Sequence, residues 1–223
     1  MLNLSHASKR YPGGIEALHD VSLTIERGQL VLVEGDSGAG KSTLLKLLSA
    51  IELPSAGAVV IDGQNTRALG TRALALLRRQ FGVIFQDHKL LFDRNAFENV
   101  MLPLDIGGFE RREAQRRARA ALDKVGLLHK EKALPVALSG GEQQRLCIAR
   151  AIVHRPSVIV ADEPTGNLDQ TQAERVLDML DSFNALGVTM VISTHDRMAR
   201  ERLDGQRVRL RSGALIEPAL AAR

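Results

Sequence analysis

Short runs of aliphatic and β-branched residues alternate with longer stretches of helical periodicity along most of this 223-residue chain. The runs with the length of strands are Leu30–Glu34, Val59–Asp62, Val83–Gln86, Val158–Ala161 and Val188–Ser193. Helical patterns cover Ser42–Ile51, Glu142–His154 and about Thr171–Leu186. Strands that alternate with helices favour an α/β fold with a mostly parallel sheet.

The alternation stops between Asp87 and about Val136, where the pattern is largely helical. We interpret this part as an inserted helical lobe. Three further runs, Val21–Ile25, Arg207–Leu210 and Ala214–Glu217, are interpreted as antiparallel strands. The prediction is one domain, in which residues 1–86 and 137–223 form the core with an antiparallel β subdomain and residues 87–136 form the lobe.

Composition narrows the functional classes. The chain has 30 basic and 26 acidic residues, no Trp and one Tyr, so aromatic platforms for stacked bases are scarce and nucleic-acid binding is disfavoured. Cys147 is the only cysteine and lies in a helical pattern, which predicts a buried apolar side chain in a reducing compartment. No apolar run approaches the roughly 20 residues that span a bilayer, and the N-terminus does not resemble a signal peptide. We therefore expect a cytoplasmic location, with membrane contact mainly through a partner.

The first glycine-rich turn has the sequence GDSGAGKS at Gly35–Ser42 and fits the pattern G-x-x-x-x-G-K-[ST]. It follows a predicted strand and precedes a predicted helix, as a phosphate-binding loop does. Lys41 is expected to reach the β- and γ-phosphates, and the Ser42 hydroxyl to bind Mg²⁺. The nucleotide is predicted to be ATP, because no N-K-x-D guanine reader is present. The nucleotide-binding residues expected in this segment are Gly35, Ser37, Gly38, Ala39, Gly40, Lys41, Ser42 and Thr43.

A second signal is the predicted strand Val158–Ala161, which runs into two carboxylates, Asp162 and Glu163. Beside a phosphate loop, Asp162 suits the second protein anchor of Mg²⁺. Glu163 follows by one residue and is expected to point elsewhere, toward the attacking water as general base. The alternative is a polar strand end whose turn is fixed by Pro164; the phosphate loop favours the metal and base interpretation.

The second glycine-rich turn is LSGGEQQR at Leu138–Arg145. Ser139 and Glu142 have the spacing of a capping box that opens a helix. A cap does not need Gly140 and Gly141, each of which costs about 1 kcal/mol in a helical turn. The two glycines are explained if a ligand such as a phosphate approaches the backbone closely.

LSGGEQQR resembles the signature motif of ABC-type ATPases, and the other motifs of that family occur in the family's order. The resemblance implies a P-loop NTPase core, with Tyr11 stacked on adenine, Gln86 sensing Mg²⁺ and water, and His195 at the γ-phosphate. GNLD at Gly166–Asp169 is similar to the D-loop. The catalytic residues implied are Glu163, His195, Gln86 and Lys41; the metal residues are Ser42, Gln86 and Asp162; and Ser139, Gly140, Gly141, Glu142 and Asp169 join the nucleotide-binding set.

For the assembly, the resemblance implies a head-to-tail homodimer that holds two ATP molecules. Each ATP binds to one subunit's phosphate loop and is covered by Ser139–Gly141 of the other subunit.

The stretch FQDHKLLFDRNAFENVMLPL, Phe85–Leu104, resembles the cell-division branch of the family most. That branch implies an FtsX-like transmembrane partner, regulation of septal cell-wall hydrolysis, and contact with other division proteins. The expected location is the cytoplasmic face of the bacterial inner membrane, at the septum. The alternative is the ATPase subunit of a lipoprotein-release or macrolide-type efflux transporter. Whether the cycle transports a substrate or only signals is left open by the motifs.

Two surface features have alternative interpretations. Leu90, Leu91, Phe92 and Phe97 are expected either to form a groove for a helix of the membrane partner or to belong to the lobe's own core. The arginine-rich helix at Arg111–Arg119 either faces anionic lipid headgroups or is exposed to solvent. In the second case, Glu110 and Glu113 form ion pairs with arginines one helical turn away.

Overall fold

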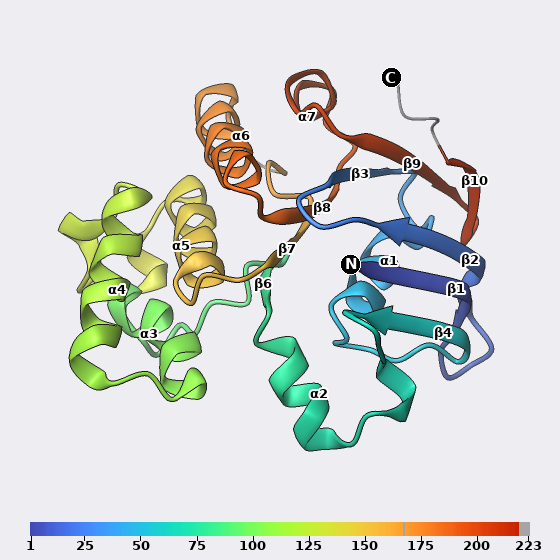
Figure 1. The fold of residues 1–223 in the computed structure, drawn as a ribbon. Coiled ribbons are helices and arrows are strands. Elements are labelled where there is room, and N and C mark those ends of the chain that lie inside the picture. Colours follow the sequence, from blue (N-terminus) through green and yellow to red (C-terminus); the bar gives the residue numbers. More distant parts are fainter. Residues whose placement is uncertain (167, 219–223) are drawn as a thin grey trace.

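A computed structural model describes residues 1–166 and 168–218, which form two sheets with helices around them (Figure 1). The larger sheet has six strands in the order β10-β9-β3-β8-β7-β6. Its neighbours pair in parallel from β9 to β6, and only β10 is antiparallel to β9. The bounds are β3 Leu30–Glu34, β6 Phe81–Ile84, β7 Val158–Asp162, β8 Thr189–Ser193, β9 Gln206–Arg211 and β10 Ala214–Pro218.

The smaller sheet is antiparallel and has the order β2-β1-β4-β5. Its bounds are β1 Leu2–Arg10, β2 Glu16–Ile25, β4 Ala56–Ile61 and β5 Gln64–Asn65. Strand β1 is absent from the sequence prediction. Its pairing with β2 shifts register between Leu4 and Ala7, so its apolar positions do not alternate regularly.

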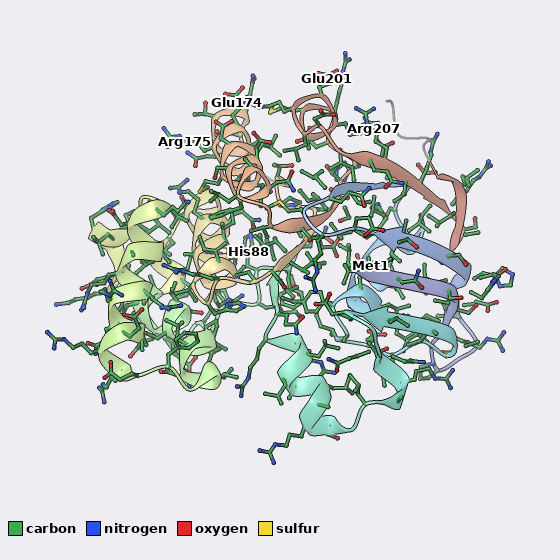
Figure 2. The ribbon with its side chains drawn as sticks, viewed as in Figure 1. Met1, His88, Glu174, Arg175, Glu201 and Arg207 are labelled. Carbon is green, nitrogen blue, oxygen red and sulfur yellow. The ribbon has the colours of Figure 1, made fainter. Side chains whose placement is uncertain are left out.

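Seven helices surround the sheets within the described residues: α1 Lys41–Leu48, α2 Thr71–Arg78, α3 Ala96–Gly107, α4 Arg111–Lys124, α5 Gly140–Ile152, α6 Gln170–Ala185 and α7 Arg197–Arg202. Short 3₁₀ turns lie at Thr66–Ala68, Leu128–Lys130 and Pro135–Ala137. Helix α1 ends before the predicted Ile51, because Ser49 caps it and Ala50 has a φ of 53°. Charged side chains such as Arg175 and Glu201 lie on the outer surface of α6 and α7 (Figure 2). None of the helices described here combines the length and the apolar character of a bilayer-spanning segment.

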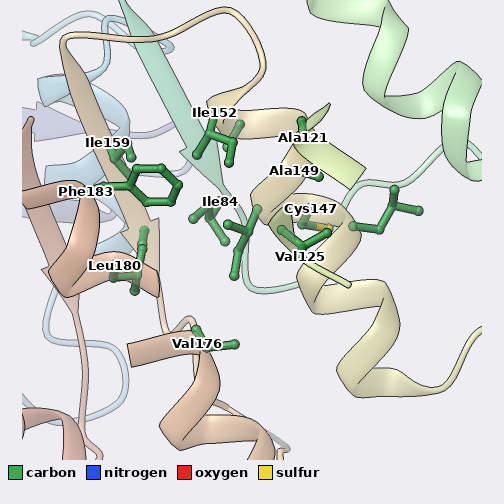
Figure 3. Packing of buried hydrophobic residues seen from close by; sticks show 14 of the residues in the cluster. Ile84, Ala121, Val125, Cys147, Ala149, Ile152, Ile159, Val176, Leu180 and Phe183 are labelled. Atoms are coloured by element: carbon green, nitrogen blue, oxygen red, sulfur yellow. The ribbon is translucent and has the colours of Figure 1, made fainter. Parts of the chain in front are cut away.

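The central strands divide their side chains between two cores. In β3, Leu30 and Leu32 pack into a cluster with α3, α4, α5 and α6, whereas Val31 and Val33 pack into a second cluster with α1 and the antiparallel sheet. Figure 3 shows part of the first cluster, where Phe183 and Ile159 pack near Ile84. Both faces of the sheet are therefore covered, as the continuous apolar runs of its strands require.

Strand β9 corrects one expectation. Arg207–Leu210 was expected in an antiparallel strand; β9 is antiparallel to β10 but pairs in parallel with β3, with Leu32 opposite Arg207. The reason is the connection from β8, which passes through α7 and returns the chain in the same direction. The last two strands thus extend the central sheet.

The lobe consists of α3 and α4, and α5 packs against both of them (Figure 1). Cys147 on α5 is buried, as predicted, and its thiol donates a hydrogen bond to the His88 carbonyl oxygen at 3.2 Å. Burial raises the pKa of the Cys147 thiol to about 12. The thiol is therefore protonated at neutral pH and behaves as a small core side chain.

Asn99 on α3 organises the loop that enters the lobe. The side chain is fully buried; its Oδ1 accepts from the Leu91 amide at 2.9 Å, and its Nδ2 donates to the carbonyl oxygens of Leu91 and Arg94, both at 2.9 Å. Buried backbone groups need such partners. One amide side chain therefore fixes the loop between β6 and α3.

We predict that Asn99→Leu, which removes these hydrogen bonds, lowers the free energy of unfolding by about 2–4 kcal/mol. Urea unfolding followed by circular dichroism measures the change. The matched control is Asn3→Ala, because Asn3 Nδ2 donates only to the exposed Thr24 hydroxyl, at 2.8 Å. Equal effects of the two substitutions would contradict the role given to Asn99.

Candidate functional site

A pocket of about 530 Å³ lies at the carboxyl ends of β3, β6, β7 and β8. This is the edge at which parallel α/β sheets bind ligands. The sequence-predicted residues Gln86, Asp162, Glu163 and His195 line this pocket together with the phosphate loop. The complete lining is Ala17, Gly35, Asp36, Ser37, Gly38, Ala39, Gly40, Lys41, Ser42, Thr43, Gln86, Asp162, Glu163 and His195.

The phosphate loop ends at Gly40, which is the N-cap of α1. Gly40 has a φ of 104°, and a Cβ there would lie 2.5 Å from the Ala17 carbonyl oxygen, so only glycine fits. No side chain caps the helix, and its first turn has no acidic residue. The first amides of α1 are therefore available to an anion, and the helix dipole favours one.

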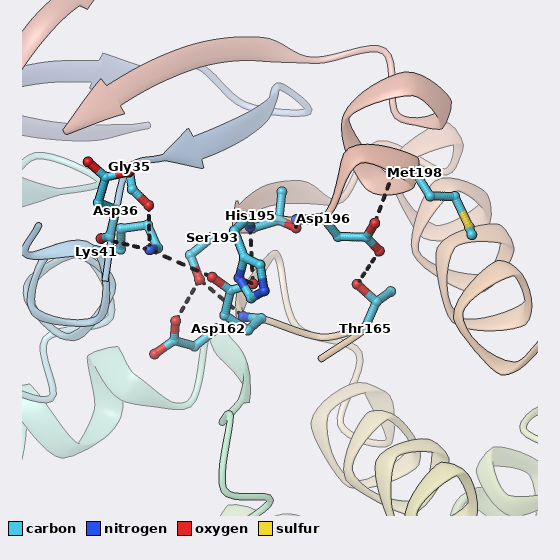
Figure 4. Close-up of polar contacts among 11 residues, drawn as sticks. Gly35, Asp36, Lys41, Asp162, Thr165, Ser193, His195, Asp196 and Met198 are labelled. Atoms are coloured by element: carbon cyan, nitrogen blue, oxygen red, sulfur yellow. Dashed lines mark hydrogen bonds and ion pairs between the residues drawn. The ribbon is translucent and has the colours of Figure 1, made fainter. Parts of the chain in front are cut away.

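Lys41 is folded back onto the loop. Its ammonium donates to the carbonyl oxygens of Gly35 at 2.7 Å and Asp36 at 3.2 Å, and it lies 3.7 Å from Glu163 Oε1 (Figure 4). The side chain is largely buried, with 10% of its surface exposed. The Lys41 ammonium is held by neutral carbonyl acceptors beside the free amides of the loop. It is therefore suited to bind a phosphate, which is a stronger, charged acceptor.

Glu163 is the most constrained residue of the pocket. It is 7% exposed and has a φ of 49°, a conformation that costs energy for a non-glycine residue and clusters at functional sites. Its amide donates to the Ser193 carbonyl oxygen at 3.1 Å and to the Ser193 hydroxyl at 3.0 Å. Its carboxylate lies 2.8 Å from His195 Nδ1, and the His195 amide donates to it at 3.2 Å. The carboxylate thus points into the pocket between a lysine and a histidine.

Asp162 is fixed by Ser193, a residue that the sequence prediction missed. The Ser193 hydroxyl donates to Asp162 Oδ1 at 2.5 Å, and the two residues are paired neighbours in strands β7 and β8 (Figure 4). Ser193 was detectable only as the last residue of a predicted strand beside the acidic one. A single buried hydroxyl therefore positions both members of the acidic pair.

The structure does not bring the second glycine-rich turn into this pocket. Within the described residues, the lining includes none of Ser139, Gly140, Gly141 and Glu142, which open α5 instead. The capping box forms as predicted, and Lys130, at 2.5 Å, is the main reason that the pKa of Glu142 is lowered.

Tyr11 and Asp169 also lie outside the lining. The Tyr11 hydroxyl is 3.4 Å from the hydroxyl of Thr43, which does line the pocket, and Asp169 is the N-cap of α6. Asn167, in the predicted D-loop, lies outside the described residues.

Of the two interpretations of Leu90, Leu91, Phe92 and Phe97, the structure favours the lobe's own core for Leu90 and Phe97, and none of the four residues lines the larger apolar hollow described below. Leu90 is buried in the core, and Phe97 lines another hollow with the Arg119 guanidinium over its ring. The four side chains do not form one groove, because they turn to different sides of the loop and of α3: Leu90 is buried, whereas Phe92 is 57% exposed.

The stretch Phe85–Leu104 does contribute to a different groove, of about 690 Å³, between α2, α3 and α5. Its lining is Ala75, Arg78, Arg79, Phe81, Val83, Phe85, Lys89, Leu102, Pro103, Ile106, Gly107, Phe109, Arg150, Ala151 and His154. The Arg150 guanidinium donates to the carbonyl oxygens of His88 at 2.6 Å and Lys89 at 2.7 Å, which ties α5 to the loop after Gln86.

The arginines of α4 are mostly paired. Arg116 and Arg117 bind Glu113 at 2.6 and 2.7 Å, Arg119 binds Glu131 at 3.0 Å, and Glu110 caps the helix. This arrangement favours the solvated helix face over the lipid-binding interpretation.

Comparison with known proteins agrees with this geometry. Residues 18–166 match the family described as ABC transporter. The chain is 51% identical over 196 residues to the cell division ATP-binding protein FtsE of Escherichia coli, covering 88% of each chain, and 38% identical to FtsE of Bacillus subtilis, covering 97% of this chain and 95% of that one. A dimeric post-hydrolysis structure of the ATP-binding cassette MJ0796 bound to ADP and Pi superposes with a TM-score of 0.91 at 35% identity and covers 97% of each chain.

Ser193→Ala is predicted to lower ATP turnover by about 10–100-fold with little change in ATP affinity. It removes the hydrogen bond to the Asp162 carboxylate and one acceptor of the Glu163 amide, and it leaves the phosphate loop intact. Steady-state kinetics and titration calorimetry separate the two effects. Ser49→Ala is the matched control, since Ser49 is also buried but bonds the Leu45 carbonyl oxygen in α1, at 2.8 Å. Wild-type turnover in Ser193→Ala would exclude this role.

Proposed function

We propose a function from one premise: the chain belongs to the ABC transporter family, with an ATPase fold that extends over almost its whole length. It is an ATPase, which binds ATP and hydrolyses it to ADP and phosphate. The observation that carries the proposal is the convergence of Lys41, Glu163 and His195 in the phosphate-loop pocket. The roles of individual residues, given next, are our proposal.

The phosphates of ATP occupy the amide cradle of the loop and α1. Lys41 exchanges its carbonyl acceptors for the phosphate oxygens, a stronger charge-assisted interaction. Glu163 accepts a proton from the water whose oxygen attacks the γ-phosphorus, and the bond to the β,γ-bridging oxygen breaks to release ADP. His195 keeps the Glu163 carboxylate oriented and contacts the γ-phosphate, while Gln86 positions the water.

Mg²⁺ fits the oxygen donors of this pocket. No three His, Cys, Asp or Glu side chains in the described part of the chain gather into a metal cluster, but Mg²⁺ commonly uses one or two protein oxygens besides phosphates and water. Ser42, Asp162 and Gln86 line the same pocket. These three residues would hold the ion, which would neutralise phosphate charge when bound.

The catalytic site is composite. In the part of the chain that the structure describes, the first turn of α5 contributes no residue to the pocket lining and lies elsewhere on the chain. The related MJ0796 cassette was solved as a dimer. We infer that ATP is sandwiched between two copies in a head-to-tail homodimer, with Tyr11 on the adenine and the other copy's Ser139, Gly140 and Gly141 on the γ-phosphate. Glu142 holds that turn in place, and Asp169 starts the neighbouring helix.

The membrane partner is an FtsX-like transmembrane protein, and the process is cell division. The similarity to FtsE proteins from three genera supports this assignment. ATP-driven dimerisation would then be relayed through the partner to septal cell-wall hydrolases, with the chain attached peripherally to the cytoplasmic face of the inner membrane at the septum. A subunit of a lipoprotein-release or efflux transporter is the second candidate, because the hydrolytic residues serve both.

A helix of the membrane partner docks in the groove between α2, α3 and α5. Apolar side chains dominate that groove, and Ile106 there is 59% exposed. Lobe residues 87–136 provide one wall and the core provides the other, so docking spans both parts of the domain. Burial of such an exposed apolar surface is what a partner helix supplies.

Glu163→Gln should keep ATP binding, abolish turnover and accumulate ATP-bound dimers, because it removes the proton acceptor and keeps the shape of the side chain. Turnover assays and analytical ultracentrifugation with ATP measure these effects. A rate within about threefold of wild type would exclude Glu163 as the base.

Lys41→Ala should weaken ATP binding by at least about tenfold, and Ser139→Ala should lower turnover. In a mixed dimer, the intact phosphate loop of the Ser139→Ala chain faces the intact Ser139 of the Lys41→Ala chain. One composite site is therefore complete, and activity should rise above that of either variant alone. Calorimetry and turnover assays on the mixture test both points. No gain on mixing would contradict sharing of the site.

Ile106→Asp should abolish co-purification with the FtsX-like protein while the isolated chain keeps its ATPase activity, because a carboxylate is costly to bury in an apolar contact. Affinity purification from membranes measures the association. The matched control is Leu186→Asp, since Leu186 is 75% exposed and lies outside the groove. Retention of the partner by Ile106→Asp would place the docking site elsewhere.

A further inference from the structure

Gln172 contacts the turn that the composite site needs. It is the third residue of α6, and its amide donates to Asp169 Oδ1 at 2.9 Å, which fixes its backbone at the start of the helix. Helices α5 and α6 lie beside each other in Figure 1. Across that boundary, a Cβ built on Gly141 would lie 3.1 Å from Gln172 Cγ and 3.2 Å from its Oε1. The side chain of Gln172 therefore packs directly on Gly141.

A second contact lies one turn further along α5. Arg145 Nη1 donates a hydrogen bond to Gln172 Oε1. Arg145 is half-buried, and burial lowers the pKa of its guanidinium, so the group depends on a good acceptor. Gln172 thus touches α5 at two successive turns, once through packing and once through a hydrogen bond.

These contacts set the direction of the first turn of α5. The capping box orders that turn internally through Ser139 and Glu142, but it does not determine how the turn faces a second chain. Gln172 holds the same turn from outside, at the glycine whose backbone a phosphate would approach. Gly166, four residues before α6, donates its amide to the backbone carbonyl oxygen of Glu163 at 3.0 Å.

We propose that Gln172 is a positioning residue of the composite ATP site: through Gly141 and Arg145 it aims the first turn of α5 at the nucleotide bound by the other copy. The inference rests on the proposed composite site. Gln172 then serves the ATP of the partner subunit and not the ATP of its own chain. A residue that only stabilised the fold would serve both equally.

The test uses mixed dimers assembled from two chains with different affinity tags. One chain carries Lys41→Ala, so that the only working phosphate loop belongs to the other chain and faces α5 of the Lys41→Ala chain. Gln172→Ala on the Lys41→Ala chain should lower ATP turnover on the order of tenfold, because misplacing donors costs less than removing them. Gln172→Ala on the other chain should leave turnover within about twofold.

Two reference variants accompany it. Gln170→Ala is the matched control, since Gln170 lies in the same turn of α6 but bonds Glu174 at 3.2 Å on the surface; it should have no effect in either chain. Ser139→Ala, placed in the same two ways, reports on the composite site itself and should show the asymmetry strongly. The same variants can also be compared by the fraction of ATP-bound mixed dimer that they form. For that measurement the chain with the working phosphate loop carries Glu163→Gln, so the readout does not depend on turnover.

The outcomes separate the two proposals. Asymmetry here means that a substitution lowers turnover in the Lys41→Ala chain but not in the other chain. If Ser139→Ala shows this asymmetry and Gln172→Ala does not, the role of Gln172 is overturned and the composite site stands. No asymmetry for Ser139→Ala overturns the composite site. An equal loss from Gln170→Ala also overturns the inference, because the helix start would then matter and not the contact. If Gln172→Ala does not fold, Gln172→Met, which keeps the packing and removes the acceptor, carries the same test.

Discussion

The contact of a buried carboxylate with a lysine ammonium and a histidine ring is the interaction around which this protein is organised. Glu163 is almost inaccessible, has a left-handed backbone, and lies near both Lys41 and His195. A charged group in such a place needs fixed partners. Glu163 and its two partners come from three separate segments of the chain. The order of strands β3, β8 and β7 is what brings the three segments to one edge of the sheet. Loss of β3 or β8 would leave the Glu163 carboxylate without one of its partners.

The sequence predicts those parts of the fold in which the local hydrophobic pattern is enough to determine where the segment lies in the folded chain. Strands β3 and β7 are continuous apolar runs buried on both faces, and each leads directly into site residues. The apolar run and the site residues after it therefore both indicate a central strand that ends at the site. The phosphate loop is predicted for the same reason: each of its residue types has a local mechanical role.

The parts that the sequence does not predict depend on distant contacts. Strand β1 has bulges that break its periodicity, and the parallel pairing of β9 depends on the path through α7. Ser193 acts through a neighbouring strand, and serine at a strand end is too common to stand out. The sequence leaves open whether Leu90 and Phe97 form a groove or belong to the core, and only the packed structure decides for the core. For β9 and Ser193 the deciding contact joins residues that are far apart in sequence.

Helix α5 joins two regions that would otherwise be independent. Its first turn contains Gly141, and its last turns present Arg150 to the loop after Gln86 and to the wall of the apolar groove. An α-helix of 13 residues is about 20 Å long and hardly bends over that length. It therefore acts as a rigid lever, and any tilt imposed at its glycine end must shift the far end by a comparable amount. In the proposed assembly, α5 would therefore transmit a displacement at the contact between two copies, without an intervening hinge, to the groove proposed for the membrane partner.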